Sequence, residues 1–342
     1  MRQLAFLLFL FSLVSFSPKN DPEQIVVARI EYIYALKTPL GKNGWKNFDK
    51  RKYDVPLLYY ADSCTYAANP TKKFLEIYRP ALVHRGKRLS IYKVPRRIDN
   101  VLFHMETSVT TDDPARYDHL SPYMHCSSPE ETRRLIEDVT TTEQWVTMVV
   151  HEYFHGFQYK HTPYLEHLQA LPVTPDSLQK IYKRNAWFKE KLDKENALLL
   201  AAIGAPQKSD SLIDAFFALR NARRTETKQK LGLDIASYEK AYETMEGTAR
   251  YVEYKLYEQF SQKQPDPKLS SSDTAYKAYA YFSNYSIEKD AWLYKSSQGS
   301  YYYATGFNTA RLLDRLTIEY KSKLFRNGPL TLEDLLRKPM KK

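Results

Sequence analysis

The segment His151-Glu152-Tyr153-Phe154-His155 has the pattern H-E-x-x-H. On a helix, residues four apart lie on one face about one turn apart, so both imidazoles could bind the same Zn²⁺ ion. The carboxylate of Glu152 could then hold a metal-bound water and accept its proton. These residue types at this spacing predict metal-assisted hydrolysis.

The residues around this pattern favour a helix with one apolar and one polar face. Thr140 and Glu143 have the spacing of a capping box, which places the helix start near Thr141. On a helical wheel, one side carries the apolar residues Trp145, Val146, Val149, Val150, Tyr153 and Phe157. The other side carries the polar residues Gln144, Thr147, His151, His155 and Gln158. The alternative to a metal site here is a pair of hydrogen-bonded histidines.

A catalytic zinc ion usually has three protein ligands and one open position for water. One candidate for the third ligand is His161, because it follows His151 at the spacing of H-E-x-x-H-x-x-G-x-x-H. However, Gln158 replaces the glycine that lets the chain turn sharply in that pattern. We therefore expect the helix to continue and His161 to point away from the metal.

The other candidate is Glu246, in a second amphipathic stretch. Its apolar stripe is formed by Tyr242, Met245, Ala249, Val252, Leu256 and Phe260. Glu246 and Glu253 border this stripe, whereas Glu243 is expected to point outward. A glutamate at the border of a buried face needs a partner, which is either a metal ion or a Lys or Arg side chain. We favour Glu246 over His161, with Glu253 as a supporting group beside the ligands.

With these motifs the chain resembles the gluzincin metallopeptidases, and is distantly similar to the aminopeptidase N-like and glycyl-aminopeptidase-like families. Those families pair H-E-x-x-H with a later helix of the type E-G-x-x-x-Y-x-E, which matches Glu246, Gly247, Tyr251 and Glu253. They also have a Tyr-x-x-Gly segment before a Leu-rich helix, which matches Tyr303 and Gly306, with Tyr302 as the next best tyrosine. The resemblance implies that Glu246 is the third zinc ligand and that Tyr303 stabilises the oxyanion.

The resemblance covers about residues 140–160, 243–254 and 300–316. Ninety residues separate His155 from Glu246, whereas those families place the glutamate much sooner, so we expect a helical insertion at about 162–235. The family's exopeptidase motif, G-x-M-E-N, is only echoed by His104-Met105-Glu106-Thr107. A core position for Met105 and a surface position for Glu106 is the simpler interpretation.

The N-terminal segment predicts export from the cell. A basic start, an apolar run and small residues are typical of a signal peptide, which we assign to residues 1–17. No later segment is long and apolar enough to cross a membrane, so a secreted, periplasmic or cell-envelope location is expected. The net charge of +11 is dispersed without any nucleic-acid module, and no nucleic-acid binding is expected. Cys64 and Cys126 permit either one disulfide or two free thiols.

Short β-type runs precede the metal motif, and helical patterns follow it. Strands are expected at 24–34, 88–94 and 101–106. Helices are expected from Ser128-Pro129, around 177–200, 209–230 and 235–262, and from about Gly306 to Lys321, with a loop at 262–273. We therefore expect an α+β, zincin-like fold with a strand-rich N-terminal part at 18–127 and a mainly helical catalytic part at 128–342.

The expected function is that of an exported zinc metallopeptidase, which hydrolyses peptide bonds of a peptide or protein substrate through a metal-activated water. In this scheme His151, His155 and Glu246 bind Zn²⁺, Glu152 is the general base and Tyr303 donates a hydrogen bond to the oxyanion. One alternative is a non-catalytic zincin-fold binding or scaffold protein of the cell envelope. Another is a zinc amidohydrolase that acts on a non-peptide amide. The intact Glu152 disfavours the scaffold, which has no use for a general base.

Overall fold

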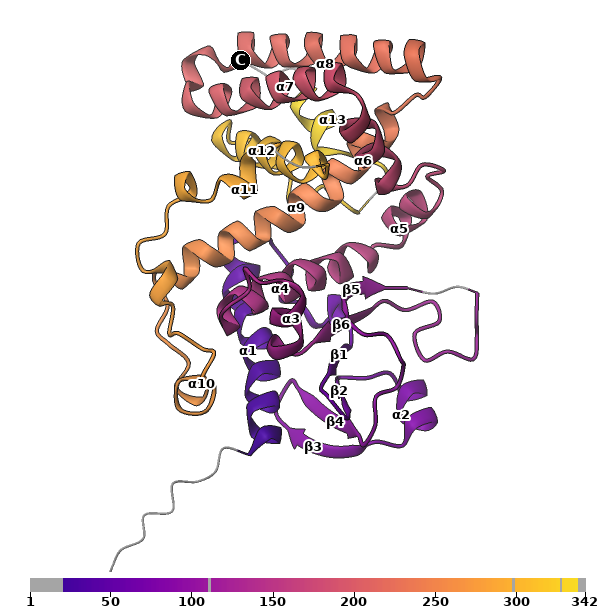
Figure 1. The fold of residues 1–342 in the computed structure, drawn as a ribbon, viewed down its shortest axis with the longest axis vertical. Helices are drawn as coiled ribbons and strands as arrows, with labels where there is room; N and C mark the ends of the chain where they lie inside the picture. The colour runs from indigo at the N-terminus through magenta and orange to yellow at the C-terminus, as the bar shows by residue number, and fades with distance from the viewer. Residues whose placement is uncertain (1–20, 110–111, 297–298, 327, 338–342) are drawn as a thin grey trace, which may run out of the picture.

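A computed structural model of the chain describes residues 21–109, 112–296, 299–326 and 328–337. The predicted signal peptide at 1–17 lies outside these residues. Within them, a six-stranded sheet is followed in sequence by helices that stack above it, which confirms the α+β class (Figure 1). In the part of the chain so described, no helix is both long and apolar enough to span a membrane.

The sheet is mixed, with strand order β3-β4-β2-β1-β6-β5. Its strands are β1 (Leu57–Tyr60), β2 (Thr65–Ala68), β3 (Ala81–Arg85), β4 (Ser90–Val94), β5 (Met105–Ser108) and β6 (Tyr123–Ser127). Only β1 and β6 pair in parallel; the other neighbours are antiparallel. The strand predicted at 88–94 is confirmed as β4, whereas β5 begins later than the run predicted at 101–106. Strand β5 forms one edge of the sheet, beside the helix that carries the H-E-x-x-H motif.

The strand predicted at 24–34 is wrong, because this segment belongs to helix α1 (Pro22–Asn43). Asp21 caps the helix by accepting a hydrogen bond from the Glu23 backbone N–H, and Pro22 suits the first turn. The β-branched residues favour a strand locally, but the buried positions repeat at helical spacing, as in Val26, Arg29, Ile30, Ile33, Leu36, Lys37 and Leu40. Burial of this face against the rest of the protein outweighs the local preference.

The H-E-x-x-H motif lies on helix α4 (Thr142–Tyr159). A capping box does begin this helix, but it joins Thr141 and Gln144, one residue later than predicted. Glu143 has a different role: it is buried, and its carboxylate accepts hydrogen bonds from the backbone N–H groups of Lys277 and Tyr279. The α4 helix packs on β5 and β6 and, on its other side, against α9 (Ala236–Phe260).

The remaining helices are α2 (Lys72–Tyr78), α3 (Pro129–Leu135), α5 (Thr162–Gln169), α6 (Pro175–Arg184), α7 (Ala186–Gly204), α8 (Ser209–Leu231), α10 (Pro267–Ser272), α11 (Ala291–Tyr294), α12 (Tyr301–Arg315) and α13 (Leu332–Arg337). Among them, those predicted from Ser128 and at 209–230 are confirmed, the stretch predicted at 177–200 is divided into two helices, and α2, α5, α11 and α13 were not predicted. Short 3₁₀ helices occur at Arg51–Tyr53, Pro206–Lys208, Ala280–Phe282 and Ile287–Lys289. The loop predicted at 262–273 contains α10. The last predicted helix, placed at Gly306 to Lys321, starts earlier and ends earlier as α12, and α13 follows it.

The helices form successive layers above the sheet. Figure 1 shows α4 next to the strands, then α9, then α12, with α7 and α8 at the far end from the sheet. Helices α9 and α12 cross at Gly247 and Gly306. A Cβ atom on Gly247 would lie 2.3 Å from the Gly306 carbonyl carbon, and one on Gly306 would lie 2.0 Å from the Glu243 carbonyl oxygen. Only glycine allows the two backbones to approach this closely.

A buried ion network joins the outer helices to α9. Its members are Arg220, Arg223 and Arg224 of α8, Glu195 of α7, Glu239 and Glu243 of α9, and Glu333 of α13. The prediction that Glu243 points outward is therefore wrong, because its carboxylate binds Arg220 and accepts a hydrogen bond from Thr305 of α12. The guanidinium group of Arg220 compensates the charge of the buried carboxylate. Sequence periodicity alone does not reveal this partner.

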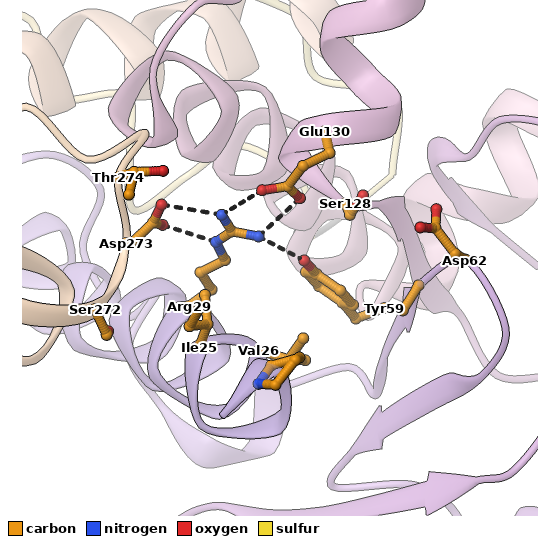
Figure 2. Close-up of a pocket in the computed structure, with 12 residues that line it drawn as sticks. Ile25, Val26, Arg29, Tyr59, Asp62, Ser128, Glu130, Ser272, Asp273 and Thr274 are labelled. Atoms are coloured by element: carbon orange, nitrogen blue, oxygen red, sulfur yellow. Dashed lines mark hydrogen bonds and ion pairs between the residues drawn. The ribbon is translucent and has the colours of Figure 1, made fainter. Parts of the chain in front are cut away.

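A second, smaller cluster of charges lies at a pocket of about 340 Å³ beside α1 (Figure 2). Arg29 donates hydrogen bonds to both carboxylate oxygens of Asp273, to both of Glu130, and to the Tyr59 hydroxyl. All the nitrogen atoms of this guanidinium are thus used within the protein. The cluster joins α1, α3, β1 and the segment after α10, and it leaves no free donor of Arg29 for a ligand.

Of the two alternatives that the sequence leaves open for the cysteines, the structure has the second: Cys64 and Cys126 are both free thiols.

Candidate metal centre

The structure brings His151, His155 and Glu246 together between α4 and α9. The Nε2 atoms of His151 and His155 lie 3.3 Å and 3.2 Å from the same Glu246 oxygen, Oε2. All three side chains are buried, and one potential ligand atom from each lies within 4.8 Å of the others. Among the described residues, Glu246 has no Lys or Arg in ion-pair contact, so the predicted alternative of a Lys or Arg partner is not what the structure has.

The second nitrogen of each imidazole faces a fixed acceptor. Glu253 Oε1 lies 2.9 Å from His151 Nδ1, and Gln158 Oε1 lies 2.8 Å from His155 Nδ1. Gln158 in turn donates hydrogen bonds to the Met245 carbonyl and the Thr248 hydroxyl of α9, both at 2.9 Å. The hydrogen bond at His155 Nδ1 holds the proton there and leaves Nε2 as the lone-pair donor, whereas the contact between His151 Nδ1 and Glu253 is an ion pair without hydrogen-bond geometry. Both rings are therefore oriented with Nε2 toward Glu246.

The charges at this cluster favour a bound cation. Burial on its own would lower the pKa of His151, but Glu253 and Glu246 raise it to about 10. Burial would likewise lower the pKa of His155, but Glu246 raises it. The reverse holds for Glu246, whose pKa burial would raise but the two histidines lower. Two imidazole nitrogens and one carboxylate oxygen are also ligand types that zinc takes in catalytic sites, so the donor set fits the metal.

Glu152 lies beside the cluster on the same helix and lines the adjoining pocket. Burial raises the pKa of its carboxyl, while His155 and His151 oppose this. Its backbone carbonyl accepts a hydrogen bond from the Thr107 hydroxyl of β5, which ties α4 to the edge strand. The Thr107 backbone N–H also faces the Glu152 carboxylate and lowers its pKa. Because Glu152 lines the pocket, its remaining acceptor positions can bind a water or a substrate.

Tyr303, in the first turn of α12, is one of the tyrosines at the site, with Tyr257 in the same pocket and Tyr159 stacked on His155. Its ring stacks on His151 with 5.9 Å between the centroids and lines the same pocket. Burial and the nearby Glu246 raise the pKa of its hydroxyl, so the phenol stays protonated near neutral pH. Tyr302 instead packs against Tyr242, and its hydroxyl lies 3.4 Å from Gln179 Nε2. The structure thus brings Tyr303 and not Tyr302 to the pocket.

His161 lies apart from the cluster. Helix α4 continues only one residue past Gln158 and ends at Tyr159, so the expected long continuation is wrong, but His161 does lie away from the three clustered side chains as expected. His161 begins the next helix, α5, and its ring stacks on Tyr53 with centroids 4.7 Å apart. Its Nδ1 lies 2.8 Å from the Phe157 carbonyl oxygen. The chain does turn without the glycine, but the turn directs His161 into an aromatic cluster.

A pocket of about 580 Å³ opens at the His151 side of the cluster. Its walls are mainly apolar and aromatic, with polar groups from α4, from α9 and from Asp138 in the segment before α4. The lining residues are Met105, Ile136, Asp138, Val139, Gln144, Thr147, Met148, His151, Glu152, Arg250, Glu253, Tyr257, Trp292 and Tyr303. Met105 lines this pocket from β5, and its neighbour Glu106 is exposed. Sequence reasoning did not single out Arg250 or Trp292, because neither belongs to a ligand pattern and they meet only in the fold.

Comparison of the chain with protein-family models, with curated proteins and with solved structures finds no match. The site's chemistry is therefore argued from its own residues.

Proposed function

We propose that this protein is a zinc-dependent peptidase of the gluzincin type, with a zincin-like fold around α4 and α9. The observation that carries the proposal is the convergence of both histidine Nε2 atoms on one oxygen of Glu246, with Glu152 beside them. His151, His155 and Glu246 would hold the ion. When bound, Zn²⁺ would lower the pKa of a coordinated water and polarise the scissile carbonyl.

The chain's own residues would perform the proton transfers and orient the substrate. Glu152 accepts a proton from the attacking water and returns it to the leaving amine. The protonated hydroxyl of Tyr303 donates a hydrogen bond to the oxygen that gains negative charge. The free edge of β5 lies next to α4, where an extended peptide could pair with it as an added strand. Together these groups suit hydrolysis of an amide in an extended chain.

The proposal includes export, which rests on residues 1–17 alone. We propose a secreted, periplasmic or cell-envelope location, with a peptide or protein as substrate. The pocket beside the cluster has a volume within the range of about 300–1,000 Å³ that is usual for small-molecule sites, so it can take a substrate side chain or more.

The test combines metal analysis with digestion of a peptide library. The purified protein is expected to contain about one zinc per chain, because the donor set forms a single site. Glu152→Gln should keep the zinc and lose at least about a hundredfold in turnover, the low end of general-base effects. The matched control is Glu106→Gln, which removes an exposed carboxylate from β5 and should retain activity.

Three other results would redirect the proposal. Metal-free protein that takes up no zinc would refute the whole scheme. Zinc without cleavage of any peptide or amide would favour the scaffold alternative. Cleavage of non-peptide amides alone would favour the amidohydrolase.

A further inference from the structure

Arg250 of α9 forms one wall of the pocket beside the candidate zinc ligands. Its guanidinium lies between two aromatic rings, 4.8 Å from the Trp292 centroid and 4.7 Å from the Tyr303 centroid. Nη1 donates hydrogen bonds to the carbonyl oxygens of Trp292 and Leu293, each at 3.2 Å. These contacts fix the group in place, but all of its partners are neutral.

Arg250 forms no ion pair with the described residues. Glu253 of the same helix is the main negative charge that acts on its guanidinium, but it does not come within ion-pair distance, and Arg250 Nε has no hydrogen-bond partner among the described residues. Burial lowers the pKa of this arginine. Arg250 is half-buried, whereas the arginines that are buried among the described residues each contact at least two carboxylates; they are Arg29, Arg220, Arg223 and Arg224. A desolvated cation without a partner is costly unless something supplies the anion.

The position of this cation relates it to the reacting groups. The Tyr303 ring contacts both the Arg250 guanidinium and the imidazole of His151. One aromatic ring therefore separates the guanidinium from a proposed zinc ligand. The pocket that Arg250 and His151 share is lined by apolar side chains, among them Met148 and Tyr257, and by the carboxylates of Asp138, Glu152 and Glu253. An anion at Arg250 would thus belong to the same molecule as a group at the metal, with an apolar part between the two.

We infer that Arg250 binds a carboxylate of the substrate, and that the site prefers peptides with a large apolar side chain beside that carboxylate. This inference rests on the proposed peptidase function, because in a peptide the anion is either the C-terminal carboxylate or an Asp or Glu side chain. A guanidinium matches a carboxylate with two parallel N–H···O bonds, which is stronger than pairing with a neutral amide. Arg250 is then a specificity residue and takes no part in proton transfer.

A binding measurement tests the inference without requiring turnover. The affinities of the purified full chain for 4-phenylbutanoate and for 4-phenylbutanamide are measured by calorimetry. Zinc itself can bind the acid more tightly than the amide. The decisive quantity is therefore the ratio of the two affinities, and how much this ratio falls from the wild type to the variant. Arg250→Gln, which keeps a donor near the Trp292 carbonyl but removes the charge, should lose at least about tenfold of that preference.

Two further variants make the result specific. Arg311→Met is the matched control, because Arg311 also stacks on an aromatic ring, Phe307 of α12, but does not line the pocket. It should keep the full preference. Arg250→Lys should restore part of it, since the charge remains without the planar fork. An unchanged preference in both Arg250 variants, with zinc content and melting temperature as in the wild type, would overturn the inference.

Kinetics then identify the source of the carboxylate. Peptides that end in an apolar residue are compared in two forms, with a free C-terminal carboxylate and with a C-terminal amide. A third set consists of C-terminally amidated peptides in which an Asp or Glu lies next to the apolar residue. Arg250→Gln should raise KM for the preferred set by about tenfold or more with little change in kcat, because binding is lost and chemistry is not. Carboxylate binding without hydrolysis would keep the inference and refute the peptidase, whereas hydrolysis without an Arg250-dependent preference would do the reverse.

Discussion

Gln158 occupies the position where the metzincin pattern has glycine, yet it supports the candidate site. Its amide accepts at His155 Nδ1 and donates to the Met245 carbonyl and the Thr248 hydroxyl, so a single side chain orients one imidazole and fastens α4 to α9. The sequence shows only that a glycine is missing. The role of the replacement depends on α9, which is remote in sequence and adjacent in the fold.

The identity of the third ligand is the sharpest prediction at the residue scale. Glu246→Ala should weaken zinc affinity by more than about a hundredfold, because loss even of groups outside the ligand set can cost about 10–100-fold. His161→Ala should leave zinc affinity unchanged, since His161 contacts Tyr53 and the Phe157 carbonyl. Zinc titration of the two variants side by side is the measurement. Loss of the metal only in His161→Ala would show that the site is metzincin-like.

The two neighbouring tyrosines give a second matched pair. Tyr303→Phe should lower kcat by about 10²–10³-fold, the usual cost of one oxyanion donor. It should leave zinc content unchanged. Tyr302→Phe removes only a long contact with Gln179 and should have little effect. Steady-state kinetics of the two variants on a peptide found by library digestion decide between them, and equal activity in both would remove Tyr303 from the mechanism.

At the scale of helices, the crossing of α9 and α12 sets the distance between Glu246 and Tyr303, because Gly247 and Gly306 are close neighbours of these residues in sequence. Gly306→Ala should lower the free energy of unfolding by at least about 1–3 kcal/mol, the usual cost of overpacking. Its Cβ would meet the backbone of Glu243, which cannot move aside as a flexible side chain could. Thermal unfolding measures the effect.

The control for this crossing is Gly204→Ala, on α7. No atom lies within 4 Å of a Cβ built there, so alanine should be neutral or slightly stabilising. A Gly306→Ala variant as stable as Gly204→Ala, with unchanged activity, would mean that the two helices can separate without cost.

The elements that the sequence predicted well are those whose signal is local. Ser128 and Pro129 begin α3 as expected, and the helical runs after it appear as α6 to α9, because caps and 3.6-residue periodicity act within each segment. Helix α1 was missed, since its β-branched residues favour a strand and only its burial against distant elements decides otherwise. The outward placement of Glu243 failed for the same reason, because its partner Arg220 comes from another helix.

The candidate site also has features that the sequence predicts and features that only the packing of distant segments determines. The H-E-x-x-H spacing predicts which side chains share a face of α4, and the motif around Glu246 was matched by resemblance. That these two faces meet, that Glu253 supports His151, and that Arg250 forms no ion pair depend on the packing of α4, α9 and α12. Such relations between distant segments have no signature in spacing.

On the scale of the whole molecule, the ion network of α8 holds the outer helices to α9, which carries Glu246. Arg220 binds Glu195, Glu243 and Glu333, and through Glu243 it contacts Thr305 of α12. Helices from both ends of the C-terminal part therefore meet at one cluster. Removing one member leaves buried charges uncompensated, which typically costs about 3–5 kcal/mol. The stability of the candidate site should follow that of this network.

Acid should unfold the protein through this network. Burial on its own would raise the pKa of Glu333, but Arg220 and Arg224 lower it from 4.5 to about 2. Between these two values the unfolded chain binds a proton that the folded chain does not, so stability increases with pH in that window. The contribution of Glu333 is complete above about pH 4.5 and is lost as the pH falls toward 2, and it amounts to roughly 3 kcal/mol.

Urea unfolding between pH 7 and pH 3 tests this. Glu333→Gln should be less stable than the wild type at pH 7, and its stability should fall less steeply below pH 4.5, because one titrating group is gone. Glu190→Gln is the control, since Glu190 forms an exposed pair with Lys194 and should change neither quantity. A Glu333→Gln variant with the wild-type pH dependence would show that other carboxylates govern acid unfolding.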